Sequence, residues 1–374
     1  MQPWVIFLNI AVVFFLIRLK VHFYIVFSYL VFGFVLVLAI LDGSSYIYRS
    51  VATYLILFLG LHFFYLVCVT SFPALLCAVF FSNLVWIFFG LCQYFLGVDS
   101  LSFLVNLRSS ADRGMTSLAP EPTHFGLQLI FFSWIILILN QAGLVSLRRA
   151  VFFVAINFFS VVFLAKSSMA VLYILVFLPF FFLARGVSLK SIPFLLGLFL
   201  VFCLIGLLYL DVNPESRLAF IATNLLSDPL SVPQEDASVN ARASHLVLSL
   251  YGAFSGMFYP HGFSAFNDHS YVLNKELGEF FWYNYQSNII MSGLGALLYE
   301  LGALGLLFLL FTFFFMMGWA GFNKYGFYSF ALLWIFMAGA MPVSYPMLSA
   351  IIVLVYFVTS GRVRAMLKGE RNDG

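Results

Sequence analysis

Charge is scarce in this chain of 374 residues: only 9% of them are Asp, Glu, Lys or Arg, whereas 63% are hydrophobic. Soluble domains carry roughly 25% charged residues. At a mean hydropathy of +1.05, the chain lacks the polar side chains that would cover a water-exposed surface. Its apolar runs are continuous rather than alternating, which disfavours a transmembrane barrel. We therefore predict an all-α polytopic membrane protein that forms a single integral membrane domain over residues 1–374.

Cysteine pairs and nucleotide-binding motifs are missing as well. The chain has four cysteines, none of them in a CxxC arrangement and all of them in apolar runs. The sequence therefore indicates neither a disulfide framework nor a zinc site. It contains no HExxH, GxxxxGK[ST] or GxGxxG motif, and the DxD of metal-dependent sugar-nucleotide transferases is absent too. We expect no metal, no other cofactor and no nucleic-acid partner.

Long apolar runs dominate what is present. A membrane-spanning helix needs about 20 mainly apolar residues, and about eleven runs (ten to twelve) are candidates. Two neighbouring runs are separated only by "KSSM" (166–169), which predicts a tight hairpin. The candidate spans are 4–18, 22–41, 51–70, 73–95, 125–141, 150–165, 169–184, 191–210, 290–317, 326–342 and 345–360.

Two connections are long, residues 96–124 and residues 211–289, and both lie on the same side of the membrane. The loops of the opposite side carry eleven Lys and Arg residues, against seven on this side. Because cytoplasmic loops carry the excess of basic residues, we place both long loops on the outer face. They hold 16 of the chain's 33 charged residues. Within the apolar segments the main charges are Glu300 and the hairpin residue Lys166, so function is expected at the outer face.

Basic residues of the outer face are the first candidates for binding. The guanidinium group of arginine is planar, permanently charged and suited to phosphate oxygens. Lys166 lies in a turn too short to be a solvated loop, which favours a function for it. Alternatively, Arg108 and Arg217 only pair with acidic residues of the same loops. The basic candidates are Arg108, Arg113, Lys166, Arg217 and Arg242.

The same loops contain groups that exchange protons. His245 follows Arg242 by three residues, so a helix would place both side chains on one face. The prolines of "PEP" (120–122) predict an extended, non-helical stretch. That stretch would hold Glu121 and His124 above the start of the next span. Which residue acts as a general base stays open among Glu121, His245 and His261.

Five stretches resemble, in the same order, segments of the Wzy-type O-antigen polymerases of the O-antigen ligase and polymerase superfamily. "RGMTSLAPEPTHFG" (113–126) is similar to their RG…SL.PEP…G segment. "LAKSSMAVL" (164–172) resembles a tight outer hairpin, and "VNARASHLVLSLYGAF" (239–254) resembles the arginine-bearing part of a large periplasmic loop. "YPHGFSAF" (259–266) resembles the glycine-containing segment after it, and "LLYELGALGLL" (297–307) resembles the LxELGxxGLL helix that follows.

The chain departs from the superfamily pattern at two places. The hairpin usually carries an arginine, whereas the basic residue here is Lys166. In ligases the helix before ELG tends to begin with a His-Asn pair, and Met291 and Ser292 stand at those positions. This favours a polymerase over the alternative, an O-antigen ligase that transfers glycan to lipid A-core. An alternative of another class is a lipid-linked oligosaccharide flippase or transporter, for which we would expect a charged central cavity and smaller outer loops.

The resemblance implies a metal-independent membrane glycosyltransferase of the bacterial inner membrane. Its fold would be a GT-C-like bundle with a large, partly helical periplasmic loop, and its active site would lie on the periplasmic side. The donor would be a growing glycan on undecaprenyl pyrophosphate, and the acceptor a repeat unit on the same carrier. The expected partners are these lipid-linked oligosaccharides, membrane lipid, a co-polymerase that regulates chain length and a flippase.

The resemblance and the residue chemistry together define the expected site. An Arg/Lys clamp would hold the pyrophosphate and stabilise the charge that develops on it. The expected catalytic residues are Arg113, Arg242, His245 and Glu121. The residues expected to bind pyrophosphate or glycan are Arg108, Lys166, Arg217, His124 and His261.

Overall fold

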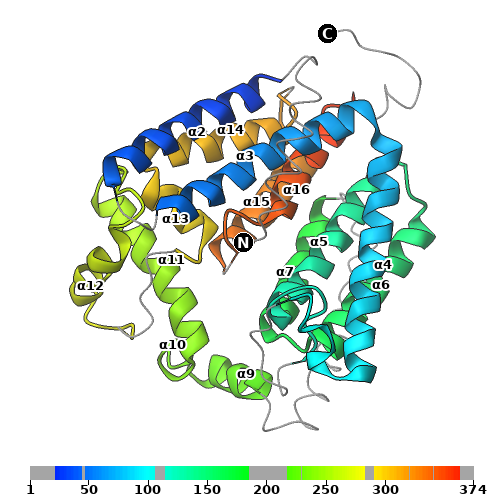
Figure 1. Ribbon diagram of the computed structural model, residues 1–374, viewed down its shortest axis with the longest axis horizontal. Coiled ribbons are helices and arrows are strands. Elements are labelled where there is room, and N and C mark those ends of the chain that lie inside the picture. The colour runs from blue at the N-terminus through cyan, green and yellow to red at the C-terminus, as the bar shows by residue number, and fades with distance from the viewer. Residues whose placement is uncertain are drawn as a thin grey trace.

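The structure, a computed structural model, consists of helices joined by short turns and longer loops (Figure 1). It describes residues 22–43, 47–105, 114–184, 217–228, 230–282, 290–319, 321–339 and 341–362. All regular structure in these ranges is helical, as predicted. The longer helices of the first half are α2 (Phe23–Asp42), α3 (Ile47–Thr70), α4 (Phe72–Leu96), α5 (Pro122–Gln141), α6 (Leu147–Ser160) and α7 (Ser168–Ala184). The α-helices described in the second half, long and short, are α9 (Arg217–Ser227), α10 (Val232–Glu235), α11 (Ala237–Ser255), α12 (Phe266–Glu276), α13 (Gly293–Glu300), α14 (Ala303–Met316), α15 (Lys324–Ala338) and α16 (Pro346–Thr359).

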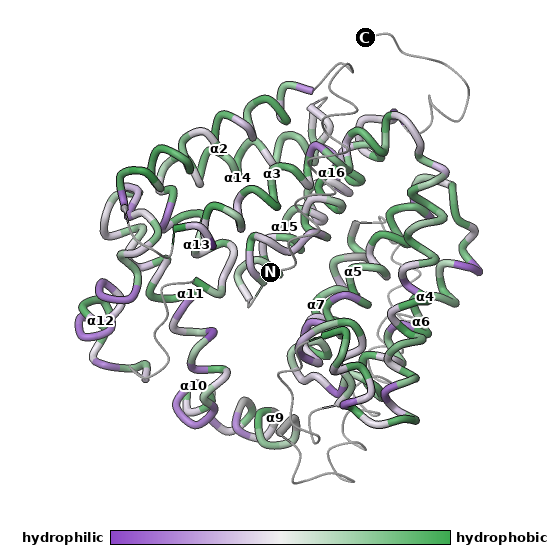
Figure 2. The backbone as a smooth tube through the Cα atoms, in the orientation of Figure 1, coloured by the Kyte–Doolittle hydropathy of each residue, from purple (hydrophilic) through white to green (hydrophobic). Residues whose placement is uncertain are grey.

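Five helices are long and apolar enough to cross a membrane: α2, α3, α4, α5 and α6 with its continuation to Ala165. Shorter apolar helices lie in α7, α14 and α16. Figure 2 shows apolar residues along most of these helices. They are consistent with a protein embedded in a membrane. The predicted spans 4–18 and 191–210 lie outside the described residues, and the total of eleven spans stays a prediction.

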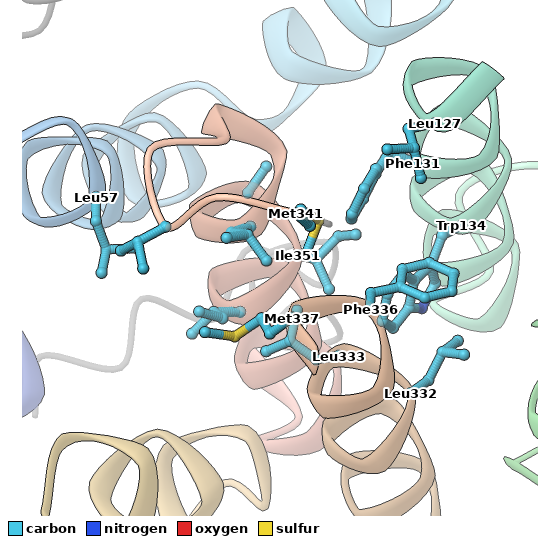
Figure 3. Packing of buried hydrophobic residues seen from close by; sticks show 14 of the residues in the cluster. Leu57, Leu127, Phe131, Trp134, Leu332, Leu333, Phe336, Met337, Met341 and Ile351 are labelled. Carbon is cyan, nitrogen blue, oxygen red and sulfur yellow. The ribbon is translucent and has the colours of Figure 1, made fainter. Parts of the chain in front are cut away.

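Helix α5 lies at the centre of the core. It packs against α4, α6, α7 and α16, while α15 packs against both α7 and α16. The ring of Phe336 in α15 lies 5.6 Å from that of Phe131 and 5.7 Å from that of Trp134 in α5, and all three side chains are buried (Figure 3). This aromatic contact joins the first and second halves of the chain, because α5 and α15 are far apart in sequence.

The predicted hairpin at "KSSM" is confirmed and is very tight. Helix α6 ends in a π-helical turn, Val161–Ala165, and α7 begins at Ser168. Lys166 has a left-handed backbone conformation with φ of 47°, and its N–H donates to the Val161 carbonyl at 3.1 Å. π-Helical turns are rare and frequently occur at functional sites.

The prediction of one continuous span over 290–317 is wrong. The chain forms α13 and α14, which are separated at Leu301 and Gly302. Gly302 has φ of 58° and ψ of −130°, a conformation that only glycine adopts readily. A Cβ atom on Gly302 would also collide with the Phe258 carbonyl oxygen. Sequence hydropathy does not reveal this break, since mainly apolar residues lie on both sides of it.

Four helices, α9 to α12, lie in the described part of the second long connection. Helix α11 packs against α10, α12 and α13, and Figure 1 shows this group together at one end of the molecule. Asp42, the last residue of α2, accepts hydrogen bonds from the backbone of Phe263 and Ser264. The C-terminal end of α2 therefore meets the second long connection, as the predicted topology requires.

Candidate functional site

The first long connection packs directly onto the hairpin between α6 and α7. The N–H of Met115 donates to the Leu164 carbonyl at 2.8 Å. Gly114 has φ of 93°, and a Cβ atom there would collide with the backbone of Ala165. Glycine is thus required at position 114 for two separate reasons. Two of the five stretches identified in the sequence, 113–126 and 164–172, are in contact.

Gln93 of α4 holds this segment in place. Its Oε1 accepts hydrogen bonds from the N–H groups of Thr116 and Ser117, at 2.9 and 2.6 Å. Its Nε2 donates to the Val98 carbonyl at 3.2 Å, and Ser117 Oγ donates to the Trp86 carbonyl at 2.6 Å. The sequence analysis did not identify Gln93. The sequence does show a polar amide side chain within an otherwise apolar helix. Such a side chain needs hydrogen-bond partners when it is buried, so Gln93 could have been recognised as a structural contact.

Glu121 and His124 lie where the first long connection enters α5. Glu121 has extended backbone, with φ of −139° and ψ of 148°, as predicted for its position between two prolines. Pro122, however, is the first residue of α5, so the predicted non-helical stretch ends one residue earlier. Proline is well tolerated at that position, because its missing N–H has no helical partner there. His124 therefore lies in the first turn of the helix.

Lys166 lies beside this entry point. Ser167 Oγ donates to Thr123 Oγ1 at 3.2 Å, which joins the hairpin to the first turn of α5. Lys166 is exposed, whereas Glu121 and His124 are half-buried. The structure thus brings Glu121, His124 and Lys166 onto adjoining segments at one end of the bundle. We call these three residues the hairpin group.

A second group of predicted residues lies on and around α11. Asp236 caps this helix, its Oδ1 accepting from the N–H groups of Ser238 and Val239, both at 2.9 Å. The helical conformation needed to place Arg242 and His245 one turn apart is present. Arg242 is half-buried, whereas His245 is only 1% exposed.

The surroundings of His245 favour a positioning role over that of a general base. Its Nδ1 accepts a hydrogen bond of 3.1 Å from the N–H of Met291, and the Phe266 ring lies 5.3 Å away. An Nδ1 that accepts from a backbone amide already uses its lone pair. The neutral ring then carries its proton on Nε2, so neither nitrogen is available to take a proton. His245 instead holds Met291, two residues before the first residue of α13.

His261 lies in a compact cluster with His269 and Tyr299. The rings of His261 and Tyr299 stack at 4.4 Å with an interplanar angle of 17°. The Nε2 of His261 donates to the Gly252 carbonyl at 3.2 Å, and Nδ1 of His269 lies 2.8 Å from the Tyr299 hydroxyl. Burial lowers the pKa of His261 below its ordinary value; the Gly252 hydrogen bond opposes this shift and the neighbouring His269 adds to it. Burial thus favours the neutral form of the His261 ring. We call His261, His269 and Tyr299 the histidine cluster.

The loop that carries His261 is held from both sides. On one side, the N–H of His261 donates to the Tyr299 carbonyl at 3.1 Å, and the N–H of Ala303 donates to the Phe258 carbonyl at 2.7 Å. On the other side, Asp42 Oδ2 accepts from Phe263 and Ser264, both at 3.0 Å, and Asp42 Oδ1 accepts from the Ser264 hydroxyl. Two more of the sequence stretches, 259–266 and 297–307, are thereby packed together.

Two asparagines that the sequence analysis missed organise the end of the second long connection. Asn274 makes a pair of hydrogen bonds with the backbone of Phe281, at 2.8 and 3.0 Å. Asn240 accepts from the N–H of Trp282 at 3.0 Å and donates to the Pro233 carbonyl at 2.7 Å. Both asparagines are buried. Their side chains replace backbone hydrogen bonds in a segment without regular structure.

Three predicted site residues have no described side-chain position. Arg108 and Arg113 lie outside the described residues, although the neighbouring Gly114 is described. Arg217 begins α9, and the position of its side chain is likewise outside what the structure describes. Within the described ranges, no three His, Cys, Asp or Glu side chains gather closely enough to hold a metal ion.

Comparison of the chain with family models, with curated proteins and with solved structures finds no match.

Proposed function

We propose that the protein is a membrane glycosyltransferase of the O-antigen polymerase type. It would transfer a growing glycan from undecaprenyl pyrophosphate onto an incoming lipid-linked repeat unit at the periplasmic face of the bacterial inner membrane. One observation supports this above the others: stretches that resemble the polymerases pack against each other in the fold. Residues 114–115 contact the 164–167 hairpin, and residues 258–264 contact the end of α13 and Asp42. Four segments picked out separately by sequence thus meet in pairs.

The proposed reaction needs no redox partner and no nucleotide. A hydroxyl oxygen of the acceptor attacks the anomeric carbon of the donor sugar. The bond between that carbon and the pyrophosphate oxygen breaks, and lipid pyrophosphate leaves with the bonding electron pair. The hydroxyl proton passes to a general base. Fixed cations around the leaving group stabilise the negative charge that develops on it.

The side chains can be assigned to these roles. In this proposal Arg242 of α11 and Lys166 of the hairpin group would be two cations of the clamp, and Arg108, Arg113 and Arg217 would complete it. Glu121 and His261 remain the candidate bases, with His124 contacting substrate beside Glu121. His245, buried against Met291, would act by positioning the entrance of α13 rather than by taking a proton.

A deletion and complementation experiment in the native host tests this function. The gene is deleted and reintroduced as wild type, and lipopolysaccharide is resolved on a gel. We expect the deletion to leave lipid A-core that carries a single repeat unit, and the wild type to restore a ladder of longer chains. Bare core with accumulating lipid-linked polymer would indicate a ligase instead. Single repeat units retained on the cytoplasmic side would indicate a transporter.

A further inference from the structure

The C-terminal half of helix α11 exposes an apolar face, whereas its buried side contains several polar residues. The buried side, packed against α12 and α13, contains the polar residues Ser244, His245 and Ser249 beside the apolar Leu248 and Ala253. The opposite face of its C-terminal half exposes Val247, Tyr251 and Phe254, which are spaced by four and three residues. A helix on the surface of a water-soluble domain exposes its polar face.

The exposed apolar surface continues past the end of α11. Met257 and Tyr259 in the following turn are 89% and 72% exposed. We call Val247, Tyr251, Phe254, Met257 and Tyr259 the α11 stripe. An exposed patch of large apolar side chains on a folded protein marks a surface that contacts a protein partner, a ligand or a membrane.

The position of the α11 stripe favours the membrane among these. The carbonyl of Phe258, which lies between Met257 and Tyr259 of the stripe, accepts from the N–H of Ala303 at the start of α14. Leu306 and Leu307 in the next turn of α14 are exposed. The stripe thus lies beside the first turn of an apolar helix whose own outward face is also apolar.

The C-terminal end of α2 lies close to the segment that follows the α11 stripe. Asp42 accepts hydrogen bonds from the backbone of residues 263–264, which follow the last stripe residue, Tyr259, by a few positions. The adjacent Ile40 and Leu41 are 80% and 76% exposed. Figure 1 shows the end of α2 beside the C-terminal end of α11. Since α2 is long and apolar enough to cross a membrane, Ile40 and Leu41 mark where its lipid-facing surface ends.

We infer that the C-terminal half of α11 lies in the outer leaflet of the membrane and that the α11 stripe contacts lipid acyl chains. The stripe extends the lipid-facing surface of α2 and α14 onto the second long connection. Tyr251 and Tyr259 suit this boundary, because tyrosine combines an apolar ring with a hydroxyl that stays in the headgroup region. Arg242, on the same helix, is then held close to the headgroups whatever reaction the protein performs. The inference does not depend on the proposed function.

Spin labels measure the environment of the stripe directly. Val247, Tyr251, Phe254 and Met257 are replaced one at a time by Cys in full-length protein whose native cysteines are changed to Ala. Each purified variant is labelled, checked for folding by size-exclusion chromatography and reconstituted into phosphatidylcholine–phosphatidylglycerol liposomes. Power-saturation spectra are recorded with oxygen, which concentrates in acyl chains, and with a water-soluble nickel chelate. Four separate positions allow for the loss of one variant.

Two reference positions set the scale. Leu30→Cys, on the exposed face of α2, reports lipid, and Lys275→Cys, exposed on α12, reports water. We expect labels at 251 and 254 to follow Leu30, with oxygen accessibility exceeding nickel accessibility. Labels that follow Lys275 would overturn the inference. Protection from both reagents would overturn it as well, because it would mean that a protein partner or a second copy covers the stripe.

Discussion

The hydroxyl of Tyr54 in α3 donates a hydrogen bond of 2.6 Å to Oε2 of Glu300 at the end of α13. Both side chains are buried, Glu300 being only 5% exposed. Glu300 also accepts through its backbone carbonyl from the N–H of Gly262 at 3.3 Å. This residue therefore connects α3, α13 and the loop of the histidine cluster. Its carboxyl group thus makes a structural contact between α3 and α13.

Replacing Tyr54 with Phe should destabilise the protein by about 1–3 kcal/mol, because it leaves the buried Glu300 carboxyl without this partner. Thermal unfolding of the detergent-solubilised protein measures the effect. Tyr24→Phe is a matched control, since it removes an equally buried hydroxyl whose partner Thr312, at 2.7 Å, keeps a second hydrogen bond to the Phe308 carbonyl. We expect the smaller loss there, about 1 kcal/mol. Equal losses in the two variants would show that the Glu300 contact has no special weight.

Gly302→Ala should cost about 4 kcal/mol or more, the range of severe backbone and packing conflicts. The new methyl group would meet the Phe258 carbonyl oxygen, and the backbone conformation is one that alanine rarely adopts. Gly278→Ala is the matched control: it also has positive φ, 76°, but open space around the added atom. It should lose only about 1–2 kcal/mol. A similar loss at both positions would mean that the contact between Gly302 and Phe258 does not constrain the fold.

Asp42→Asn should loosen the loop that carries His261. An amide offers one acceptor oxygen in place of two, so the hydrogen bonds from Phe263, Ser264 and the Ser264 hydroxyl cannot all be kept. Hydrogen exchange of the peptide covering 260–266 should become faster, while peptides of α5 stay unchanged. Asp268→Asn, on the exposed side of α12, should leave the exchange as it is. Unchanged protection in Asp42→Asn would argue against the anchor.

Stability should depend on pH through His261. Its folded-state pKa is lowered below the ordinary 6.5 mainly by burial, so the unfolded chain binds a proton more readily than the folded protein. Stability contributed by the neutral ring is present above pH 6.5 and is lost as the pH falls below that value. His261→Gln removes this dependence. Unfolding temperatures measured from pH 7.5 to pH 5 should therefore fall more steeply for wild type, whereas parallel curves would contradict the assignment.

The local structure of several segments could be predicted from sequence. The hairpin at Lys166 followed from two apolar runs joined at "KSSM" (166–169). A helix was only the condition under which Arg242 and His245 would share one face, and the structure fulfils that condition. The extended conformation of Glu121 followed from its flanking prolines. In each case the controlling interaction is local, because it depends on neighbours within a few residues along the chain.

The contacts that assemble the site could not be predicted in the same way. Gln93 and Asp42 bind backbone groups of segments far away in sequence, and apolar helices without a distinct polar face give no register for packing. The burial of His245 against Met291 is also a long-range contact, and it changes the role expected for that histidine. Gly302 breaks an apolar run for a reason that lies in the loop around Phe258.

Reconstituted activity of Arg242 variants tests the central claim most directly. Lipid-linked repeat units are extracted from the deletion strain and incorporated into liposomes with purified protein, without nucleotide and with a chelator present. We predict that wild type joins the units into a ladder. Arg242→Ala should slow the reaction by about a hundredfold, equivalent to about 3 kcal/mol. Lys275→Ala is the control, because it removes a positive charge of the second long connection that is not part of the proposed clamp. It should match wild type. A wild-type protein that is folded yet leaves the units single, or an Arg242→Ala variant as fast as Lys275→Ala, would contradict the account.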